Sequence, residues 1–225
     1  MGVKLAYSTK NIKLCEMNIK EAYQEWSSQY DTNENKTRDL EALALRTVLS
    51  TLPIDKVLEF GCGTGKNTVW FEQKAQQIIA VDLTEAMIQI ATKKINSPKV
   101  QFKIADIHQD WNFTNEQFDV VSFSLVLEHI KDLDAVFNKI SKVSKPGSFV
   151  YIGELHPFKQ YSGSKARFTT DDGEQIVTCY THHISEFIAA GKKYDFSIFS
   201  LEEWFDDNDR TQIPRILTLL FRKNN

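Results

Sequence analysis

The sequence predicts a doubly wound α/β fold, with a mainly parallel seven-stranded sheet and helices on both of its faces. Three observations lead to this prediction. Short runs of apolar and β-branched residues alternate with amphipathic segments of helical period. Several of the short runs are apolar on both faces, as buried parallel strands are. The run that ends at Phe60 is followed at once by a glycine-rich turn, GCGTG, of the kind that lets a backbone pass close to a ligand.

Five of the strands are expected in a regular strand-and-helix repeat, at residues 56–60, 77–83, 100–106, 118–126 and 148–155. The helices between them are expected at residues 65–75, 84–95 and 132–144. The second of these helices shows the pattern clearly, because Met87 and Ala91 share one face and Thr84 stands at the N-cap. Pro146-Gly147 is expected to turn the chain into the fifth strand. This alternation gives right-handed crossovers and hence a parallel sheet.

The segments that flank the repeat differ from it. Two helices, at about residues 18–30 and 37–52, precede the first strand. After Leu155 the alternation stops, and Asp172-Gly173 predicts a hairpin. Three further elements complete the chain: a helix near residues 183–194 and strands at 196–204 and 215–223.

No linker divides the chain, so a single domain over residues 1–225 is expected. Its parts are N-terminal lid helices in 1–52, a cofactor-binding core in 53–155, a small antiparallel substrate-cap insertion in 156–195 and a final strand pair in 196–225.

The whole-chain properties disfavour several classes of protein. A formal net charge of −3 provides no positive field for nucleic acid, and no apolar run approaches the roughly 20 residues that span a bilayer. Three widely spaced cysteines, Cys15, Cys62 and Cys179, make neither a disulfide framework nor a zinc pattern. We therefore expect a cytoplasmic monomer or homodimer without a nucleic-acid or membrane partner.

The turn in LEFGCGTGKNT (58–68) partly matches three cofactor classes. A phosphate-binding P-loop requires a glycine at Phe60 and a hydroxyl side chain at Asn67. The dinucleotide fingerprint GxGxxG requires a glycine at Lys66. Glu59 stands two residues before the first glycine, where its carboxylate would repel a pyrophosphate and suit a ligand that is cationic at this end.

An acidic residue, an apolar residue and GxGxG make up the first motif of the class I S-adenosylmethionine-dependent methyltransferases. The sequence resembles this family over most of its length: VLEFGCGTG looks like the first motif, IIAVDLTEAMI the second, IADIHQDW the third, FDVVSFSLVLEHI the fourth and KPGSFVYIGE the fifth. The resemblance implies a Rossmann-like fold, S-adenosyl-L-methionine as cofactor and S-adenosyl-L-homocysteine as product.

The resemblance also implies roles for residues at the strand ends. Asp82 would accept hydrogen bonds from both ribose hydroxyls, because a carboxylate offers two acceptors to a vicinal diol. Asp106 would lie near the adenine amino group, with Ile107 packed on the ring. The full set of expected cofactor-binding residues is Tyr30, Arg38, Glu59, Phe60, Gly61, Cys62, Gly63, Thr64, Gly65, Asn67, Asp82, Leu83, Met87, Ala105, Asp106, Ile107, Ser124, Leu125 and His129.

The N-terminal stretch resembles the lid helices of this group. Tyr23, Trp26 and Tyr30 would close over the cofactor and the acceptor, and Arg38 would reach the cofactor carboxylate. Alternatively, the spacing of the three aromatic residues by three and four is that of an ordinary packed helical face. His129, in LEHI, would lie near the cofactor or simply pack the loop after the fourth strand.

The absence of certain family motifs narrows the range of possible methyl acceptors. The fourth strand is followed by neither Asn-Pro-Pro-aromatic nor Pro-Cys, so base methylation is disfavoured, and Glu128 and Glu154 are isolated rather than paired as in arginine methylation. Small-molecule methylation at oxygen or nitrogen, by in-line displacement, is the expected reaction. The sequence does not identify the acceptor.

The expected acceptor site lies mainly in the cap segment. His183, His156 and His182 are the candidate bases, and Tyr161 and Tyr180, with Tyr23 and Trp26, are the candidate acceptor contacts. No metal is expected, because methyl transfer needs none. Two other functions stay open: a catalytically silent methyltransferase-like module that works through a partner, and a nicotinamide-dependent oxidoreductase, which Glu59 and Lys66 disfavour.

Overall fold

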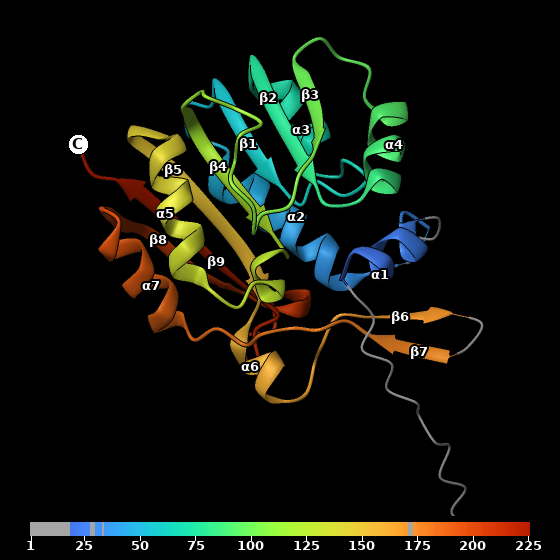
Figure 1. Cartoon of the computed structure of the whole chain (residues 1–225). Coiled ribbons are helices and arrows are strands. Elements are labelled where there is room, and N and C mark those ends of the chain that lie inside the picture. The colour runs from blue at the N-terminus through green and yellow to red at the C-terminus, as the bar shows by residue number, and fades with distance from the viewer. Residues whose placement is uncertain (1–18, 28–29, 33, 171–172) are drawn as a thin grey trace, which may run out of the picture.

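The computed structural model describes residues 19–27, 30–32, 34–170 and 173–225 of the chain. Seven strands form one sheet in the order β3-β2-β1-β4-β5-β9-β8 (Figure 1). They are β1 (Lys56–Phe60), β2 (Gln77–Asp82), β3 (Val100–Ile104), β4 (Phe118–Ser124), β5 (Ser144–Leu155), β8 (Phe196–Trp204) and β9 (Ile216–Lys223). The first five are parallel, and β9 is antiparallel to both of its neighbours. The predicted fold class is confirmed.

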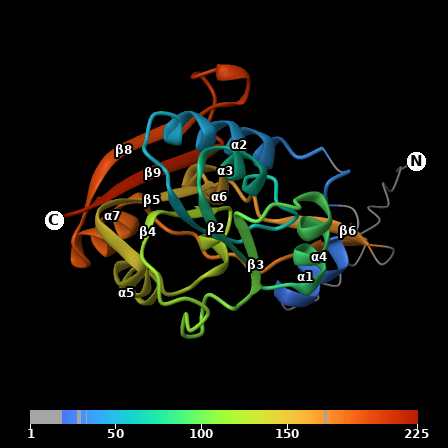
Figure 2. The same cartoon turned by 90° about the horizontal axis from the view of Figure 1, so that it is seen from above.

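Helices cover both faces of this sheet. They are α2 (Lys36–Leu49), α3 (Thr68–Lys74), α4 (Glu85–Lys94), α5 (Leu133–Val143) and α7 (Ile184–Lys193). Leu45 and Phe71, from α2 and α3, share one core cluster with Val57 of β1. Phe137 and Phe187, from α5 and α7, belong to the cluster on the other face. Figure 2 shows the two helical layers on either side of the sheet.

The remaining elements gather at the carboxyl ends of the parallel strands. They are α1 (Ile19–Trp26), the 3-10 turn η2 (Leu127–His129), α6 (Pro157–Tyr161), the hairpin β6 (Arg167–Thr170) with β7 (Gly173–Ile176), and the 3-10 turn η3 (Asp206–Asn208). In Figure 1, α6 and the hairpin lie below the sheet at this end, and α1 lies to the right, under α4. This is the end at which open α/β sheets bind ligands.

Two local expectations were wrong. Pro146-Gly147 does not precede the fifth strand but lies inside β5, which begins at Ser144 and shifts register opposite Phe118 and Val120. Gly147 supplies the positive φ of 74° that such an irregularity requires. The helix expected from residue 65 begins at Thr68, because Gly65 has a φ of 86°, which no right-handed helix accepts.

The last helix of the expected cap segment lies in the central core. Phe187 and Ala190 of α7 pack in the same cluster as Phe137 of α5 and Phe196 of β8. The part of residues 156–195 that projects beyond the sheet is therefore the stretch before α7. Cys15 and Asp172, and the start of the expected first helix, fall outside the described residues.

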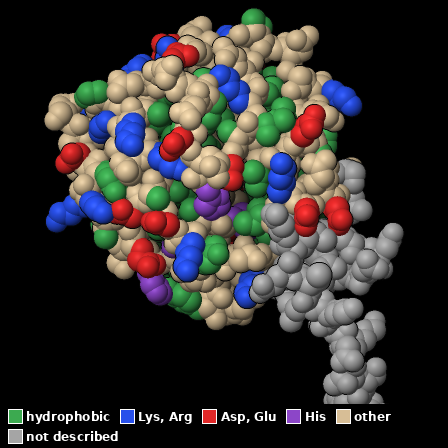
Figure 3. Space-filling view, viewed as in Figure 1, with side chains coloured by type: hydrophobic (Ala, Val, Ile, Leu, Met, Phe, Trp, Pro, Cys, Tyr) green, Lys and Arg blue, Asp and Glu red, His purple; other side chains and the backbone are tan. Residues whose placement is uncertain are grey.

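Charged side chains are spread over the face of the molecule seen in Figure 3. Acidic and basic side chains are interspersed there without an extended patch of one sign. Among the described helices, none is both long and apolar enough to cross a membrane.

Candidate active site

The glycine turn closes over the end of β1. Gly61, Gly63 and Gly65 have φ values of 65°, 53° and 86°, a region that side chains with a Cβ avoid. A Cβ at residue 61 would also lie 2.1 Å from Cγ2 of Val126, whereas one at residue 63 would meet Cε1 of Tyr30 at 3.7 Å. Close approach of the β4–η2 connection thus requires glycine at 61.

A cavity of about 770 Å³, counted out to its open mouth, lies beside this turn. The residues that line it come from the ends of β1, β2, β3 and β4 and from α1: Ile19, Tyr23, Tyr30, Phe60, Gly61, Gly63, Val81, Asp82, Leu83, Thr84, Met87, Ala105, Asp106, Ile107, His108, Ser124, Leu125, Val126, His129 and Ile130.

Asp82 is held rigidly at the end of β2. Its Oδ2 accepts the backbone N–H of Gly63 at 2.9 Å, and its Oδ1 accepts both the N–H and the hydroxyl of Thr84 at 2.9 Å. Burial raises the pKa of this carboxyl, while these hydrogen bonds oppose the rise. Because both oxygens are oriented by backbone groups, the carboxylate is preorganised to accept further donors from a ligand.

Asp106 has a different environment at the end of β3. Its Oδ1 accepts the N–H of His108 at 2.9 Å and lies 2.8 Å from Nδ1 of the same residue. Partial burial acts to raise the pKa of Asp106, but the contacts with His108 outweigh it and the pKa is lowered. Asp106 is therefore charged at neutral pH.

Two carboxyl groups lie behind the turn rather than in the cavity. Glu59 is buried and accepts the Thr68 hydroxyl at 2.6 Å, which joins β1 to α3. Glu41 of α2 accepts Asn67 Nδ2 at 3.0 Å and the Tyr151 hydroxyl at 3.1 Å. Burial raises the pKa of Glu59 to about 8 and that of Glu41 to about 7. Near neutral pH, then, Glu59 is largely protonated and does not present a negative charge to the cavity.

This arrangement predicts a pH-dependent stability. The folded pKa of Glu59 is raised above its ordinary value of 4.5, so the stability it gives is complete below about pH 4.5 and is lost as the pH rises through about 8. The glutamine side chain in Glu59→Gln is neutral at every pH. Between pH 5 and pH 9, the variant should therefore lose on the order of 3 kcal/mol less of its free energy of unfolding than the wild type does. Urea unfolding at pH 5, 7 and 9 measures the effect, with the exposed Glu85→Gln as control. Parallel pH curves for wild type and Glu59→Gln would contradict the prediction.

The aromatic lid packs together over the cavity. Ring centroids of Trp26 and Tyr30 are 5.1 Å apart, and Tyr23 lies 5.6 Å from Trp26. Asp31, directly after this cluster, accepts the Thr64 hydroxyl at 2.6 Å and pairs with Lys94 at 2.8 Å. The lid is thereby tied to both the glycine turn and α4.

Tyr23 and His129 meet at the cavity wall. The Tyr23 hydroxyl lies 2.9 Å from His129 Nε2, and Nδ1 of the same ring lies 3.0 Å from the carbonyl oxygen of Thr178. A carbonyl only accepts, so Nδ1 carries the ring proton and Nε2 accepts the Tyr23 hydroxyl. Burial raises the pKa of Tyr23 well above its usual value, so the hydroxyl stays protonated.

The three histidines expected to act as bases lie elsewhere. His156 is buried, accepts the N–H of Phe158 at Nδ1 and lies 3.0 Å from Glu203 at Nε2. His182 Nε2 lies 2.7 Å from the carbonyl oxygen of Ile130. His183 is the N-cap residue of α7, and its Nδ1 meets the Tyr161 hydroxyl. None of the three lines the cavity, and each already has a structural partner.

The expected cofactor residues divide into two groups. Those that line the cavity are Tyr30, Phe60, Gly61, Gly63, Asp82, Leu83, Met87, Ala105, Asp106, Ile107, Ser124, Leu125 and His129. Those that do not are Arg38, Glu59, Cys62, Thr64, Gly65 and Asn67. Of the expected acceptor contacts, Tyr161 is 55% exposed, and Tyr180 donates its backbone N–H to the Glu128 carbonyl at 2.6 Å.

A second cavity adjoins the first. It measures about 920 Å³ to its open mouth and shares Tyr23, Tyr30 and Leu125 with the first cavity. Leu125 has a φ of 57°, an uncommon conformation for a residue with a Cβ, which is held by its N–H bond to the Gly153 carbonyl at 2.8 Å. The rest of the lining is Trp26, Asn35, Thr37, Arg38, Glu128, Leu155, Ser164, Lys165, Ala166 and Arg215.

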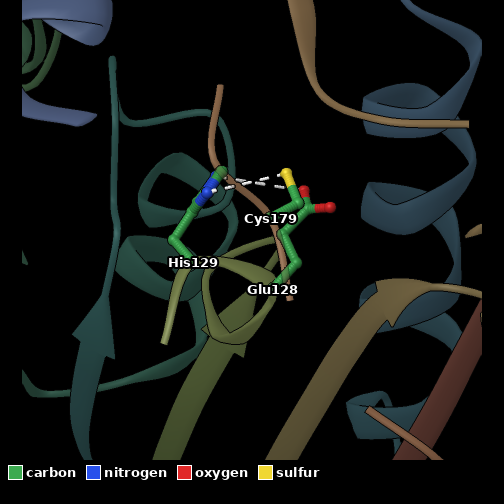
Figure 4. Close-up of side chains that lie close together, drawn as sticks. All are labelled: Glu128, His129 and Cys179. Atoms are coloured by element: carbon green, nitrogen blue, oxygen red, sulfur yellow. Dashed lines mark hydrogen bonds and ion pairs between the residues drawn. The ribbon is translucent and has the colours of Figure 1, made fainter. Parts of the chain in front are cut away.

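Glu128, which lines the second cavity, and His129, which lines the first, lie close to Cys179 (Figure 4). Their ligand atoms lie within 4.8 Å of one another. Burial and the neighbouring Glu128 raise the pKa of the Cys179 thiol to about 12, so it is not a thiolate nucleophile. Sequence reasoning missed this cluster, because Cys179 reaches it only through the fold of the cap segment.

Comparison with known proteins decides the family. Residues 58–152 match the family model described as "Methyltransferase domain". An uncharacterised methyltransferase of Emericella nidulans is 24% identical over 220 residues, which cover 80% of this chain and 76% of that protein. Residues 58–152 are thus a methyltransferase domain, and the fold and the relatives support a class I S-adenosylmethionine-dependent methyltransferase.

Other relatives of this methyltransferase match over shorter stretches. An uncharacterised methyltransferase of Schizosaccharomyces pombe is 32% identical over 109 residues, and the chain spans only 38% of its length. Among solved structures, the complex of DhpI with SAH has a TM-score of 0.72 at 23% identity and covers 91% of this chain and 94% of that one. At this identity, the structural likeness concerns the fold.

The first cavity of the methyltransferase fits the cofactor of its family. Asp82 offers oriented carboxylate oxygens at the end of β2, as a ribose diol requires. The glycine turn leaves the cavity wall free of side chains at Gly61 and Gly63. Ile107, which was expected to pack on the adenine ring, lines the same cavity beside Asp106.

Proposed function

We propose that this methyltransferase moves a methyl group from S-adenosylmethionine to an oxygen or nitrogen of a small-molecule acceptor. The observation that carries the proposal is the meeting of two cavities at Tyr23, Tyr30 and Leu125. The first would hold the cofactor and the second the acceptor. A site of this kind needs only to align two bound molecules, since the methyl group is already activated.

We assign binding and positioning roles to residues of the two cavities. Asp82 accepts the ribose hydroxyls, and Ile107 packs on the adenine. S-adenosylmethionine, when bound, supplies a methyl carbon on a positively charged sulfur. The Tyr23 hydroxyl, fixed by its 2.9 Å contact with His129, positions the acceptor at the junction of the cavities.

Two features support a small acceptor over a macromolecule. The lid aromatics Trp26 and Tyr30 cover the junction, and Asp31 ties them to the glycine turn. The net charge of −3 provides no general attraction for nucleic acid. The similar DhpI structure is a complex with SAH, which supports the same ligand for the first cavity here.

Parallel calorimetric titrations with S-adenosylmethionine, S-adenosylhomocysteine and NAD test the cofactor. Binding of the two adenosyl ligands without NAD is the expected result. An acceptor screen with a labelled methyl group then tests the transfer. Binding of NAD alone would favour an oxidoreductase, and tight binding of the adenosyl ligands without transfer to any acceptor would favour a silent binding module.

A further inference from the structure

The loop that follows β3 forms one wall of the first cavity. Asp106, Ile107 and His108 line the cavity there, although they belong to no helix or strand. The backbone groups of such a loop are not satisfied by regular secondary structure and need other partners. A wall that recognises a ligand must also keep one shape, so what holds this loop matters for binding.

Asp106 provides partners for the N–H groups of the loop. Its Oδ1 accepts the N–H of His108 at 2.9 Å, and its carbonyl oxygen accepts the N–H of Gln109 at 3.1 Å. An aspartate that binds the backbone two residues further on is typical of a tight turn. These bonds leave the carbonyl oxygens of residues 107–109 to other donors.

Lys139 of α5 donates to all three of these carbonyl groups. Its Nζ lies 2.9 Å from the carbonyl oxygen of Ile107, 2.8 Å from that of His108 and 2.7 Å from that of Gln109. An ammonium group has three donors, so a single lysine satisfies three consecutive carbonyls. Carbonyl oxygens that converge on one point repel one another, and the positive charge offsets this repulsion.

The lysine is carried by a rigid element. Val136, Phe137 and Ile140 of α5 are at most 2% exposed and belong to the core cluster on this face of the sheet. Asp132 caps the same helix by accepting the N–H of Ala135 at 3.1 Å. The core therefore fixes the helix that carries Lys139, and through the lysine it fixes the loop.

Lys139 also acts on the charge of Asp106. Partial burial acts to raise the pKa of Asp106, but the contacts with His108 and the positive charge of Lys139 lower it. An ionised carboxylate accepts hydrogen bonds and cannot donate them. Asp106 therefore favours an amino group on a purine over a carbonyl oxygen at the same position.

We propose that Lys139 is a positioning residue that shapes the adenosine end of the cofactor site and sets its preference for adenine over hypoxanthine. This rests on the proposed place of the adenine beside Ile107 and Asp106. Lys139 does not line the first cavity, so it acts through residues 106–109 and not by touching the cofactor.

Three ligands test this role in Lys139→Met, which keeps the aliphatic stem and removes the donors. They are S-adenosylhomocysteine, 5′-methylthioadenosine, which lacks the amino-acid end, and S-inosylhomocysteine, which carries an oxo group in place of the adenine amino group. Titration calorimetry should show an affinity about tenfold lower than that of the wild type for both adenosine ligands, because the loop loses three charge-assisted hydrogen bonds. The preference for S-adenosylhomocysteine over S-inosylhomocysteine should fall about fivefold, because Asp106 is no longer held in place.

Three results would overturn the proposal. The first is an unchanged affinity of folded Lys139→Met for S-adenosylhomocysteine. The second is an equal loss for S-adenosylhomocysteine and S-inosylhomocysteine, which would mean that the lysine has no part in the choice of base. The third is a loss for S-adenosylhomocysteine without one for 5′-methylthioadenosine, which would place the effect at the amino-acid end.

Further variants control for charge and for folding. Lys139→Arg keeps a cation with several donors and should regain most of the affinity and of the base preference. Lys142→Met, which removes an exposed lysine from the same helix, should bind all three ligands as the wild type does. If circular dichroism shows that Lys139→Met is unfolded, Lys139→Gln, which keeps an amide donor, is measured in its place. An arginine variant that binds as weakly as Lys139→Met would overturn the role of the charge.

The cofactor site itself is tested separately with Asp82→Asn. A wild type that binds none of the three ligands would contradict the proposed cofactor site and the role of Lys139 together. A wild type that binds S-adenosylhomocysteine, with a loss of affinity in Asp82→Asn and none in Lys139→Met, would overturn the role of Lys139 alone.

Discussion

Replacing Asp82 with asparagine is expected to weaken S-adenosylhomocysteine binding about 100-fold, or about 3 kcal/mol. The carboxylate offers charged acceptors to both ribose hydroxyls, whereas an amide has one acceptor oxygen. Oδ2 of Asp82 also accepts the N–H of Gly63 at 2.9 Å, so an amide nitrogen placed there would push against the glycine turn. Isothermal titration calorimetry measures the loss of affinity.

The matched control for this variant is Asp110→Asn. It removes the same charge from an exposed loop outside the cavity and should leave the affinity unchanged. Circular dichroism and the thermal midpoint show whether Asp82→Asn stays folded. A folded Asp82→Asn variant with an affinity within threefold of wild type would contradict the role proposed for this carboxylate.

Replacing His129 with asparagine is expected to lower turnover about 100-fold and to change the affinity for S-adenosylhomocysteine by less than tenfold. The variant removes the partner that fixes the Tyr23 hydroxyl, and small misplacements at a reacting centre cost about this much. Steady-state kinetics with the acceptor that the labelled-methyl screen identifies measures kcat and KM separately. A fall in kcat is expected to dominate.

Tyr23→Phe provides the matching half of a double-variant cycle. If the two side chains act as one unit, the double variant should be no slower than either single one. His183→Asn, at an exposed position outside the cavity, should turn over normally. Slow turnover of His183→Asn with normal turnover of His129→Asn would contradict the prediction. It would indicate that a histidine of the cap segment, and not His129, supports the methyl transfer.

Most of the fold was predictable because its signals are local. Ile78, Ile79 and Val81 make β2 apolar on both faces, which only a strand covered on both sides tolerates. The errors came where a distant contact overrides a local pattern. Pro146-Gly147 is a turn signal on its own, yet pairing of Ser144 with Phe118 of β4 extends β5 across it.

The candidate site was predictable in its cofactor half and not in its acceptor half. Asp82 and Asp106 follow buried strands, and strand ends meet at one edge of a parallel sheet, so their neighbourhood follows from the pattern. His156 and His182 have the right chemistry for a base, but they are buried against Glu203 and Ile130. These contacts depend on the tertiary structure, so the local sequence does not indicate them. Similarly, no sequence spacing indicates that Cys179 lies beside Glu128.

The position of β9 has a consequence for synthesis of the chain. β9 follows β8 in the sequence, yet it lies between β5 and β8 and pairs with both. Until residues 216–223 leave the ribosome, β5 has an open edge and β8 has no neighbour in the sheet. Exposed strand edges invite pairing with other chains. A ribosome that stalls before residue 216 would therefore hold an aggregation-prone nascent chain, and chaperone dependence should be greatest after β8 has emerged and before β9 has emerged.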